Sequence, residues 1–251
     1  MIKSVGRFVA LLAAASVLIF LLLRAVPGDP ARVALGVTAT DEAVAELSRR
    51  LGTDRPLTVQ YFDWIGGLLT GDFGVSMASG RDITPTIVER AGTSLTLTIT
   101  AMVVALLLAV PLGIRLARRP NPILAGLTQI GIAVPSFLIG ILTVALFSVQ
   151  LGWLPAGGWG SPAHAVLPVA SLALVQGAIL TRYVRAAIVE ELGKDYVRTG
   201  RAQGASISEV LYSSVLRNAA LPVLTVTGLQ LSTLIVGAVV VERVFAIPGL
   251  G

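Results

Sequence analysis

The chain has 251 residues, of which 55% are hydrophobic and 13% are charged, and its formal net charge is +5. So few charges cannot coat a globular protein of this length, but they are ordinary for a bundle of membrane helices. Cysteine is absent, which excludes disulfide bonds, thiolate metal sites and a cysteine nucleophile.

Apolar stretches near or above the length that a helix needs to cross a membrane, ~20 residues, recur along the chain. They cover residues 8–26, 94–114, 123–150, 165–181 and 219–241. Pro111 and Pro135 each lie inside a stretch, where a kink is tolerated because neighbouring helices can satisfy the freed carbonyl group. The pattern predicts an all-α membrane protein, a polytopic bundle with five spans.

The first stretch has two interpretations. Lys3 and Arg7 resemble the basic leader of a cleaved signal peptide. However, the apolar run of 16 residues between Arg7 and Arg24 is slightly long for a signal peptide, and no small-x-small cleavage site follows it. We therefore expect a retained span.

Residues 27–93 form a long polar segment between the first two spans. It holds nine acidic residues and six arginines, so its net charge is negative. Thr40 is placed to cap a helix that ends at Gly52, and a second helix around Tyr61, Phe62 and Trp64 has the pattern of one that lies in the membrane interface. A merely solvated loop is the alternative.

Basic residues indicate the orientation, because Lys and Arg accumulate in short cytoplasmic loops. They precede the first span, follow the second at 115–119, and follow the fourth between 182 and 217. All three groups lie on one side of a five-span bundle. The amino terminus is therefore predicted to be cytoplasmic and segment 27–93 extracytoplasmic.

Polar uncharged side chains also occur inside the spans. Such groups hold helices together or line an aqueous path. For the threonines and serines we favour the first role. The amides are costly to bury unpaired, and Gln230 and Thr233 repeat at helical spacing, so Gln176, Gln230 and Thr233 are candidates for lining a pathway.

Catalytic chemistry has little support in the sequence. The lysines, Lys3 and Lys194, do not follow a Gly-rich phosphate-binding loop, so the chain is not expected to bind ATP by itself. His164, the single histidine, has no nearby acidic or cysteine residue in the sequence, and the five spans contain no acidic residue. We expect no catalytic residue, no metal site and no cofactor in this chain.

The polar loop 189–221 has the strongest local signals. Gly204 suits a left-handed helix end, and Ser206 and Glu209 have capping-box spacing, so one short helix ends and another begins. Apolar residues recur on one face of the second helix at Ile207, Val210, Leu211 and Val215. A free amphipathic face on a membrane loop is suited to a groove on a partner. A helix-turn-helix for DNA is the competing interpretation, but the flanking spans would hold these helices against an acidic bilayer, so no nucleic acid is expected.

Several sequence segments carry a family resemblance. They read Asp195-Tyr196-Val197-Arg198-Thr199, Arg201-Ala202-Gln203-Gly204 and Leu216-Arg217-Asn218 with Pro222, together with Pro27-Gly28-Asp29-Pro30, Gly71-Asp72-Phe73-Gly74, Pro135-Ser136-Phe137, Leu151-Gly152-Trp153-Leu154-Pro155, Val239-Val240-Val241-Glu242 and Pro248-Gly249-Leu250-Gly251. The chain resembles the permease subunits of binding-protein-dependent ABC importers, in the dipeptide, oligopeptide and nickel branch. The resemblance covers essentially all 251 residues. It implies a location in a bacterial inner or plasma membrane.

The resemblance implies a single permease domain, residues 1–251, that works with a second homologous permease, two cytoplasmic ATPase subunits that bind ATP and Mg, and an extracytoplasmic binding protein. It implies that the coupling segment comprises Arg201, Gly204, Ala205, Ser206, Ile207, Ser208, Glu209, Val210 and Leu211, with Pro222 in the first turn of the fifth span. Two features depart from the branch, because Ala usually stands where Gly200 is, and members normally continue into a sixth span. We therefore expect the natural product to be longer. Short peptides are the expected cargo, while nickel, metal chelates, opines, sugars, or a non-transporting receptor or assembly role are the alternatives.

Overall fold

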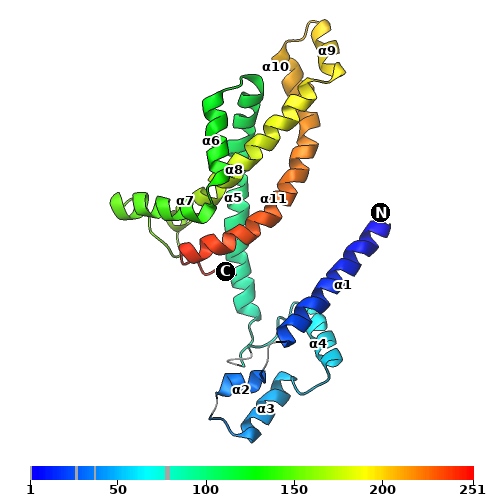
Figure 1. Ribbon diagram of the computed structural model, residues 1–251, viewed down its shortest axis with the longest axis vertical. Coiled ribbons are helices and arrows are strands. Elements are labelled where there is room, and N and C mark those ends of the chain that lie inside the picture. The colour runs from blue at the N-terminus through cyan, green and yellow to red at the C-terminus, as the bar shows by residue number, and fades with distance from the viewer. Residues whose placement is uncertain (1, 26–27, 37, 77–79) are drawn as a thin grey trace. The chain divides into compact units, whose positions relative to one another are not determined.

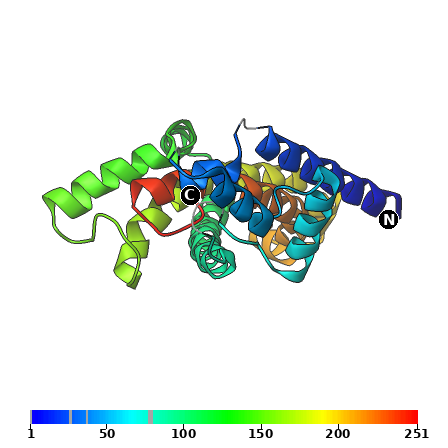
Figure 2. The same ribbon diagram turned by 90° about the horizontal axis from the view of Figure 1, so that it is seen from below.

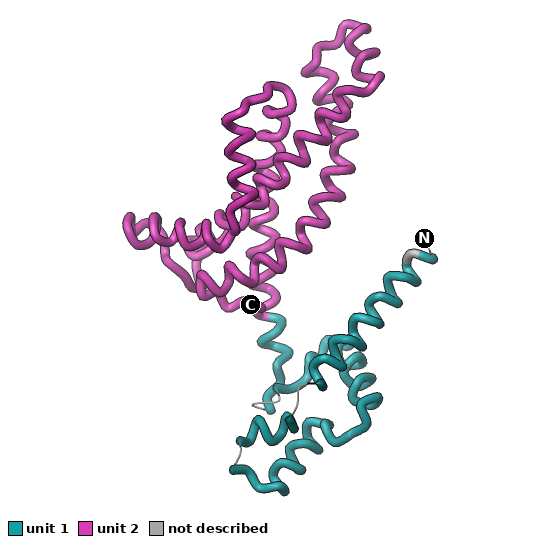
Figure 3. The backbone as a smooth tube through the Cα atoms, in the orientation of Figure 1, with its two compact units in different colours: residues 1–88 teal, residues 89–251 magenta. Residues whose placement is uncertain are grey.

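The computed structural model describes residues 2–25, 28–36, 38–76 and 80–251, and the chain divides into two compact units (Figures 1 and 3). Unit 1 comprises residues 1–88 and unit 2 comprises residues 89–251. Both consist of helices. Within the described ranges, β-structure is limited to one isolated antiparallel bridge between Val75 and Asp82. The predicted all-α class is confirmed.

Unit 1 contains four helices and the start of a fifth. They are α1 (Ile2–Arg24), α2 (Pro30–Leu35), α3 (Asp41–Leu51), α4 (Leu57–Thr70) and the first residues of α5 (Thr84–Arg118). The predicted helix after Thr40 is confirmed: the Thr40 hydroxyl accepts a hydrogen bond from the Ala43 amide, and Gly52 ends the helix with a φ of 67°. The last residue of the predicted span 8–26 and Pro27 of the first landmark lie outside the described residues.

Aromatic side chains join α4 to α1. The ring of Phe20 lies 5.4 Å from that of Tyr61 and 5.9 Å from that of Trp64, between centroids. The hydroxyl groups of Ser16 and Tyr61 are 2.8 Å apart. The second helix predicted in segment 27–93 is therefore present, while its placement in a membrane interface stays a prediction.

Unit 2 contains the rest of α5 and the remaining helices. They are α6 (Pro122–Ala133), α7 (Ser136–Thr143), α8 (Pro162–Leu192), α9 (Asp195–Ala202), α10 (Ile207–Val210) and α11 (Leu216–Val244), with π-helical segments η1 (Val144–Gln150) and η2 (Leu211–Val215). In the described chain, four helices are long and apolar enough to cross a membrane, and the bent pair α6 and α7–η1 makes up to five. The predicted number of spans is thus reached only if that pair counts as one.

The third predicted span, 123–150, is not a continuous helix. Its two halves meet at an angle of 99°, so α7 and η1 extend sideways from the rest of unit 2 (Figure 2). Val134 has an extended backbone, with φ −90° and ψ 123°, because it precedes Pro135, whose ring disfavours the helical conformation of the preceding residue. The expectation of a simple kink at Pro135 was therefore wrong.

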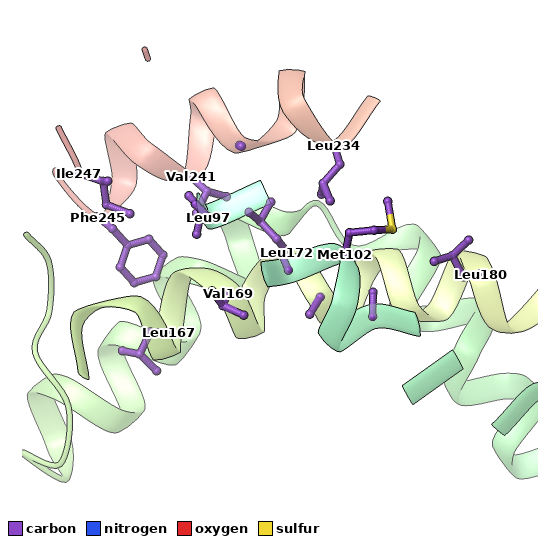
Figure 4. Close-up of a cluster of buried hydrophobic side chains, with 14 of the residues drawn as sticks. Leu97, Met102, Leu167, Val169, Leu172, Leu180, Leu234, Val241, Phe245 and Ile247 are labelled. Atoms are coloured by element: carbon purple, nitrogen blue, oxygen red, sulfur yellow. The ribbon is translucent and has the colours of Figure 1, made fainter. Parts of the chain in front are cut away.

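Small and branched apolar side chains from α5, α8 and α11 form the core of unit 2 (Figure 4). Leu97, Leu172 and Val241 are almost completely buried there. At Gly113 a Cβ atom would lie 2.6 Å from the Val184 side chain, so α5 and α8 approach too closely for any larger residue. Close approach at small residues is how membrane helices associate when there is no water to expel.

The sequence Pro-Gly-Leu-Gly after α11 folds back onto Glu242, at the opposite end of unit 2 from α9 and α10 (Figure 1). One oxygen of this buried carboxylate accepts a hydrogen bond of 2.8 Å from the Gly251 amide. A Cβ on Gly249 would lie 2.3 Å from the carboxylate carbon, so the glycine is required. The Leu250 amide donates to the Ser94 hydroxyl over 2.9 Å, which fastens this turn to α5.

Candidate functional site

The junction between α9 and α10 has the predicted geometry. Gly204 has a φ of +95°, which L side chains rarely adopt, and its amide donates to the Arg201 carbonyl over 3.1 Å. The Glu209 amide donates to the Ser206 hydroxyl, and the Ser206 amide donates to the Glu209 carboxylate over 2.6 Å. Hydrogen bonds from Ser206 lower the pKa of Glu209. Both ends of this junction are therefore held by specific contacts.

The apolar face of the second helix is not free, which corrects the sequence interpretation. Val210, Leu211 and Val215 are buried against α8, α9 and the start of α11, in a cluster that includes Ile188 and Val197. The periodicity was identified correctly, but the groove that receives this face belongs to the same chain. Of the predicted apolar face, Ile207 remains 37% exposed.

The exposed surface of the junction is smaller and more polar than expected. Of the residues predicted for the coupling segment, Arg201, Gly204, Ser206, Ile207 and Glu209 are exposed, while Ala205 and Ser208 are partly buried. Tyr212, which the sequence analysis did not select, is 62% exposed. A period of four residues from Ser208 would have placed it beside this surface.

A single helical rod connects the junction to the last span. From Ile207 to Val244 the chain is helical for 38 residues, through α10, the π-helical turn η2 and α11. Pro222 lies inside α11 and not in its first turn, which corrects a second expectation. The helix starts at the capping box, fifteen residues earlier than Pro222 suggested, because the sequence Leu211–Val215 continues it with apolar packing.

A buried carboxylate fixes α9 to the ends of α8 and α11. Glu191, at the end of α8, accepts a hydrogen bond of 2.7 Å from the Tyr196 hydroxyl and a shorter one from the Lys194 ammonium. Lys194, and then Tyr196 and Asn218, lower the pKa of Glu191, whereas burial raises the pKa of Tyr196. This network was missed, because Glu191 stands in the sequence among other charged residues with no distinguishing pattern.

The last residue of α5 also contacts the junction. The Arg118 guanidinium donates a 2.9 Å hydrogen bond to the Ser208 hydroxyl. The two arginine-containing loops predicted to share one side of the membrane, 115–119 and 182–217, are therefore in contact at one end of unit 2. Their contact was not foreseen, because 90 residues separate the partners in sequence.

Two sequence profiles match the chain along its length. The profile described as "Binding-protein-dependent transport system inner membrane component" matches residues 101–251, and "Binding-prot-dependent transport system membrane comp, N-term" matches residues 1–100. The chain belongs to this family. It is a multi-pass inner membrane permease subunit of a binding-protein-dependent ABC importer.

Similar proteins agree with this assignment. The "Glutathione transport system permease protein GsiC" of Salmonella choleraesuis (strain SC-B67) is 42% identical over 240 residues, which is 94% of this permease and 78% of the relative. GsiC of Escherichia coli (strain K12) is 41% identical with the same coverage. A solved structure, "Crystal structure of an amino acid ABC transporter with histidines", matches 66% of this chain and 75% of its own with a TM-score of 0.53 and 16% identity, which shows a shared fold.

The candidate pathway residues of the permease fall into two environments. Gln176 belongs to the buried face of α8, and its amide nitrogen has no hydrogen-bond partner among the described residues. The Thr233 hydroxyl lies 3.3 Å from the amide oxygen of Gln230 on α11, where Thr233 is exposed. Gln230 and Thr233 are thus hydrogen-bonded to each other, whereas Gln176 is enclosed. Lining of a pathway by any of them stays a prediction.

His164 is hydrogen-bonded, not clustered with acids. Its Nδ1 atom lies 2.8 Å from the Ser161 hydroxyl. Within the described ranges, no group of three or more His, Cys, Asp or Glu side chains is arranged to hold a metal ion.

Proposed function

We propose that this permease imports a short peptide of the glutathione kind, delivered by an extracytoplasmic binding protein. We further propose that the surface around Gly204–Glu209 is where the conformational change of a partner ATPase acts on the permease. The observation that supports the substrate class is the similarity to GsiC over 94% of the chain. The observation that supports coupling is the capped start of a helix that continues without a break into the last span.

The surface offered to an ATPase is small, polar and stiff. Ile207 and Tyr212 provide its exposed apolar side chains. Ser206 and Glu209 form reciprocal hydrogen bonds with each other, which hold the start of the helix. Burial of Val210 and Leu211 inside the chain prevents the helix from turning independently of α8. A displacement of this surface by a partner is therefore transmitted to α8 and α11. A flexible loop at this position would instead unfold locally and would not transmit the displacement.

The proposed partners are a second homologous permease, two ATPase subunits that bind ATP and Mg, and a binding protein that faces the amino-terminal segment 27–93. In this arrangement the amino terminus and the α9–α10 junction are cytoplasmic. The basic residues at 115–119 and 182–217 support both locations, because such residues accumulate in cytoplasmic loops. The hydrogen bond between Arg118 and Ser208 agrees with a common side for these two groups.

Uptake measurements with the complete transporter test the substrate. Cells that express the permease with its partner subunits are given labelled glutathione, a labelled dipeptide or labelled nickel, each with unlabelled competitors. We expect saturable glutathione uptake that an excess of a short peptide reduces and that nickel leaves unchanged. Uptake of nickel alone, or of a sugar alone, would refute the peptide class while leaving the transporter assignment in place.

A second measurement tests coupling separately. The Ile207→Asp variant places a charge on the exposed apolar contact without touching the buried cluster. We expect the assembled transporter to lose ATPase stimulation by its liganded binding protein, while the binding protein keeps its affinity for substrate. A variant with undiminished stimulation would show that the ATPase docks elsewhere.

A further inference from the structure

A large groove in unit 2 has a wall that offers almost no hydrogen bonds. Its volume is about 820 Å3, and it lies between α5, α6, α7 and α8. Apart from Arg115, the polar side chains in the wall are Thr128 and Thr181. Their hydroxyls donate to carbonyl groups of their own helices, at Ala125 over 2.7 Å and at Gly177 over 2.6 Å. An occupant of this groove must therefore be apolar along most of its length.

The floor of the groove is formed where α6 and α8 touch. A Cβ atom on Gly131 would lie 2.9 Å from the Cβ of Ala178, so the helices cannot approach more closely. On its outer side α6 buries none of its residues, and Leu127 and Ile130 remain 58% and 61% exposed. The groove consequently opens sideways, in the direction from which a lipid chain arrives in a bilayer.

One end of the groove is positively charged. Arg115 lines it one helical turn before Arg118, whose hydrogen bond to Ser208 marks the end of unit 2 that carries α9 and α10. No acidic side chain of the described residues pairs with Arg115 or with the neighbouring Arg119. A groove that is apolar along its length and cationic at its membrane-surface end is complementary to an anionic phospholipid, whose acyl chains are apolar and whose headgroup is negatively charged.

We propose that this groove binds an anionic phospholipid, with an acyl chain along α5, α6 and α8 and the phosphate group at Arg115. A helix of a second permease fits less well, because it would cover an unpaired guanidinium without supplying an anion. The bound lipid would fill the space beside Pro111 and the bend at Val134, where the helix is interrupted. This site is independent of the transported substrate.

Lipid binding can be measured by native mass spectrometry of the assembled transporter. After delipidation the transporter is titrated with phosphatidylglycerol or with phosphatidylethanolamine that carries the same acyl chains. We expect the permease to retain phosphatidylglycerol in preference. The Arg115→Gln variant should weaken phosphatidylglycerol binding by about fivefold, the effect of one surface arginine, and weaken phosphatidylethanolamine binding less, because the ammonium group of that lipid offsets the charge of its phosphate.

Two further variants separate the groove from general surface charge. Thr128→Phe narrows the groove and should reduce binding of both lipids. Arg90→Gln removes the same charge from the other end of α5 and should change neither. Unchanged phosphatidylglycerol binding in Arg115→Gln, or unchanged binding of both lipids in Thr128→Phe, would overturn the proposal.

The competing occupant has its own signature. A cysteine at Leu127 that cross-links to the second permease, in a transporter that binds neither lipid, would show that a protein helix fills the groove and that the proposal is wrong. Glutathione uptake does not enter this measurement, so its outcome is distinguishable from a failure of the proposed transport function.

Discussion

Replacement of Gly204 by valine should decrease both transport and binding-protein-stimulated ATP hydrolysis without unfolding the permease. The φ of +95° at Gly204 lies in the region that a side chain with a β-branch avoids. A left-handed residue costs roughly 1–2 kcal/mol, and no atom lies within 4 Å of the added Cβ, so backbone strain is the whole effect. This strain shifts the population of the intact junction by a factor of about 5–30.

The assay is substrate uptake and binding-protein-stimulated ATPase activity in proteoliposomes with matched amounts of transporter. Both should decrease several-fold in Gly204→Val. Gly204→Asn is the matched control, because asparagine tolerates a left-handed backbone, and it should retain most of the activity. If Gly204→Val transports like the parent protein, the junction does not transmit the conformational change of the ATPase, and the proposed coupling role is refuted.

Three further predictions concern stability and orientation. Because the pKa of Glu191 is lowered in the folded state, its contribution to stability is present above the unfolded pKa, which is near 4.5, and is lost as the pH falls through the folded pKa. Glu191→Gln should therefore reduce the fall in thermal unfolding temperature at acidic pH. An unchanged fall in that temperature would contradict the hydrogen-bond network of Glu191. A cysteine at Asp41, 86% exposed, should react with an impermeant thiol reagent in intact cells, and one at Asp195, 94% exposed, only after lysis; the reverse order would invert the orientation. Gly113→Val, which places a Cβ 2.6 Å from the α8 side chain it faces, should destabilise the permease by about 1–3 kcal/mol, and equal thermal stability to the parent would show that the helices can separate there.

The local features of the junction between α9 and α10 could be read from the sequence because they depend on neighbours within four residues. Capping by Ser206 and Glu209 and the left-handed turn at Gly204 require only short-range geometry. The burial of Val210 and Leu211 could not be read in this way. An apolar face indicates that something covers it, but its pattern does not say whether the cover is a partner or the same chain.

The third span shows a different limit. Composition identified 123–150 as apolar enough to cross a membrane, and Pro135 as a point of irregularity. A proline explains why helical hydrogen bonding stops, yet the 99° between the two halves depends on what each half packs against. The Arg118–Ser208 contact likewise joins residues that no periodicity connects, because 90 positions separate them in the sequence.

The unbroken helix from Ile207 to Val244 determines how far a small movement can travel. At the usual rise per residue, 38 residues extend over about 57 Å, which exceeds the thickness of a bilayer. One end begins at the capping box, and the turn that encloses Glu242 joins the other end to α5. A tilt of a few degrees about the first end would therefore displace the second, together with the part of α5 attached to it, by several ångströms. Such a rod would deliver an ATP-driven tilt to the far membrane surface without an intervening hinge loop. The helix is least regular at the π-helical turn Leu211–Val215 and at Pro222. A change of hydrogen-bond register at either place would bend the helix, and the tilt would then not reach the far membrane surface.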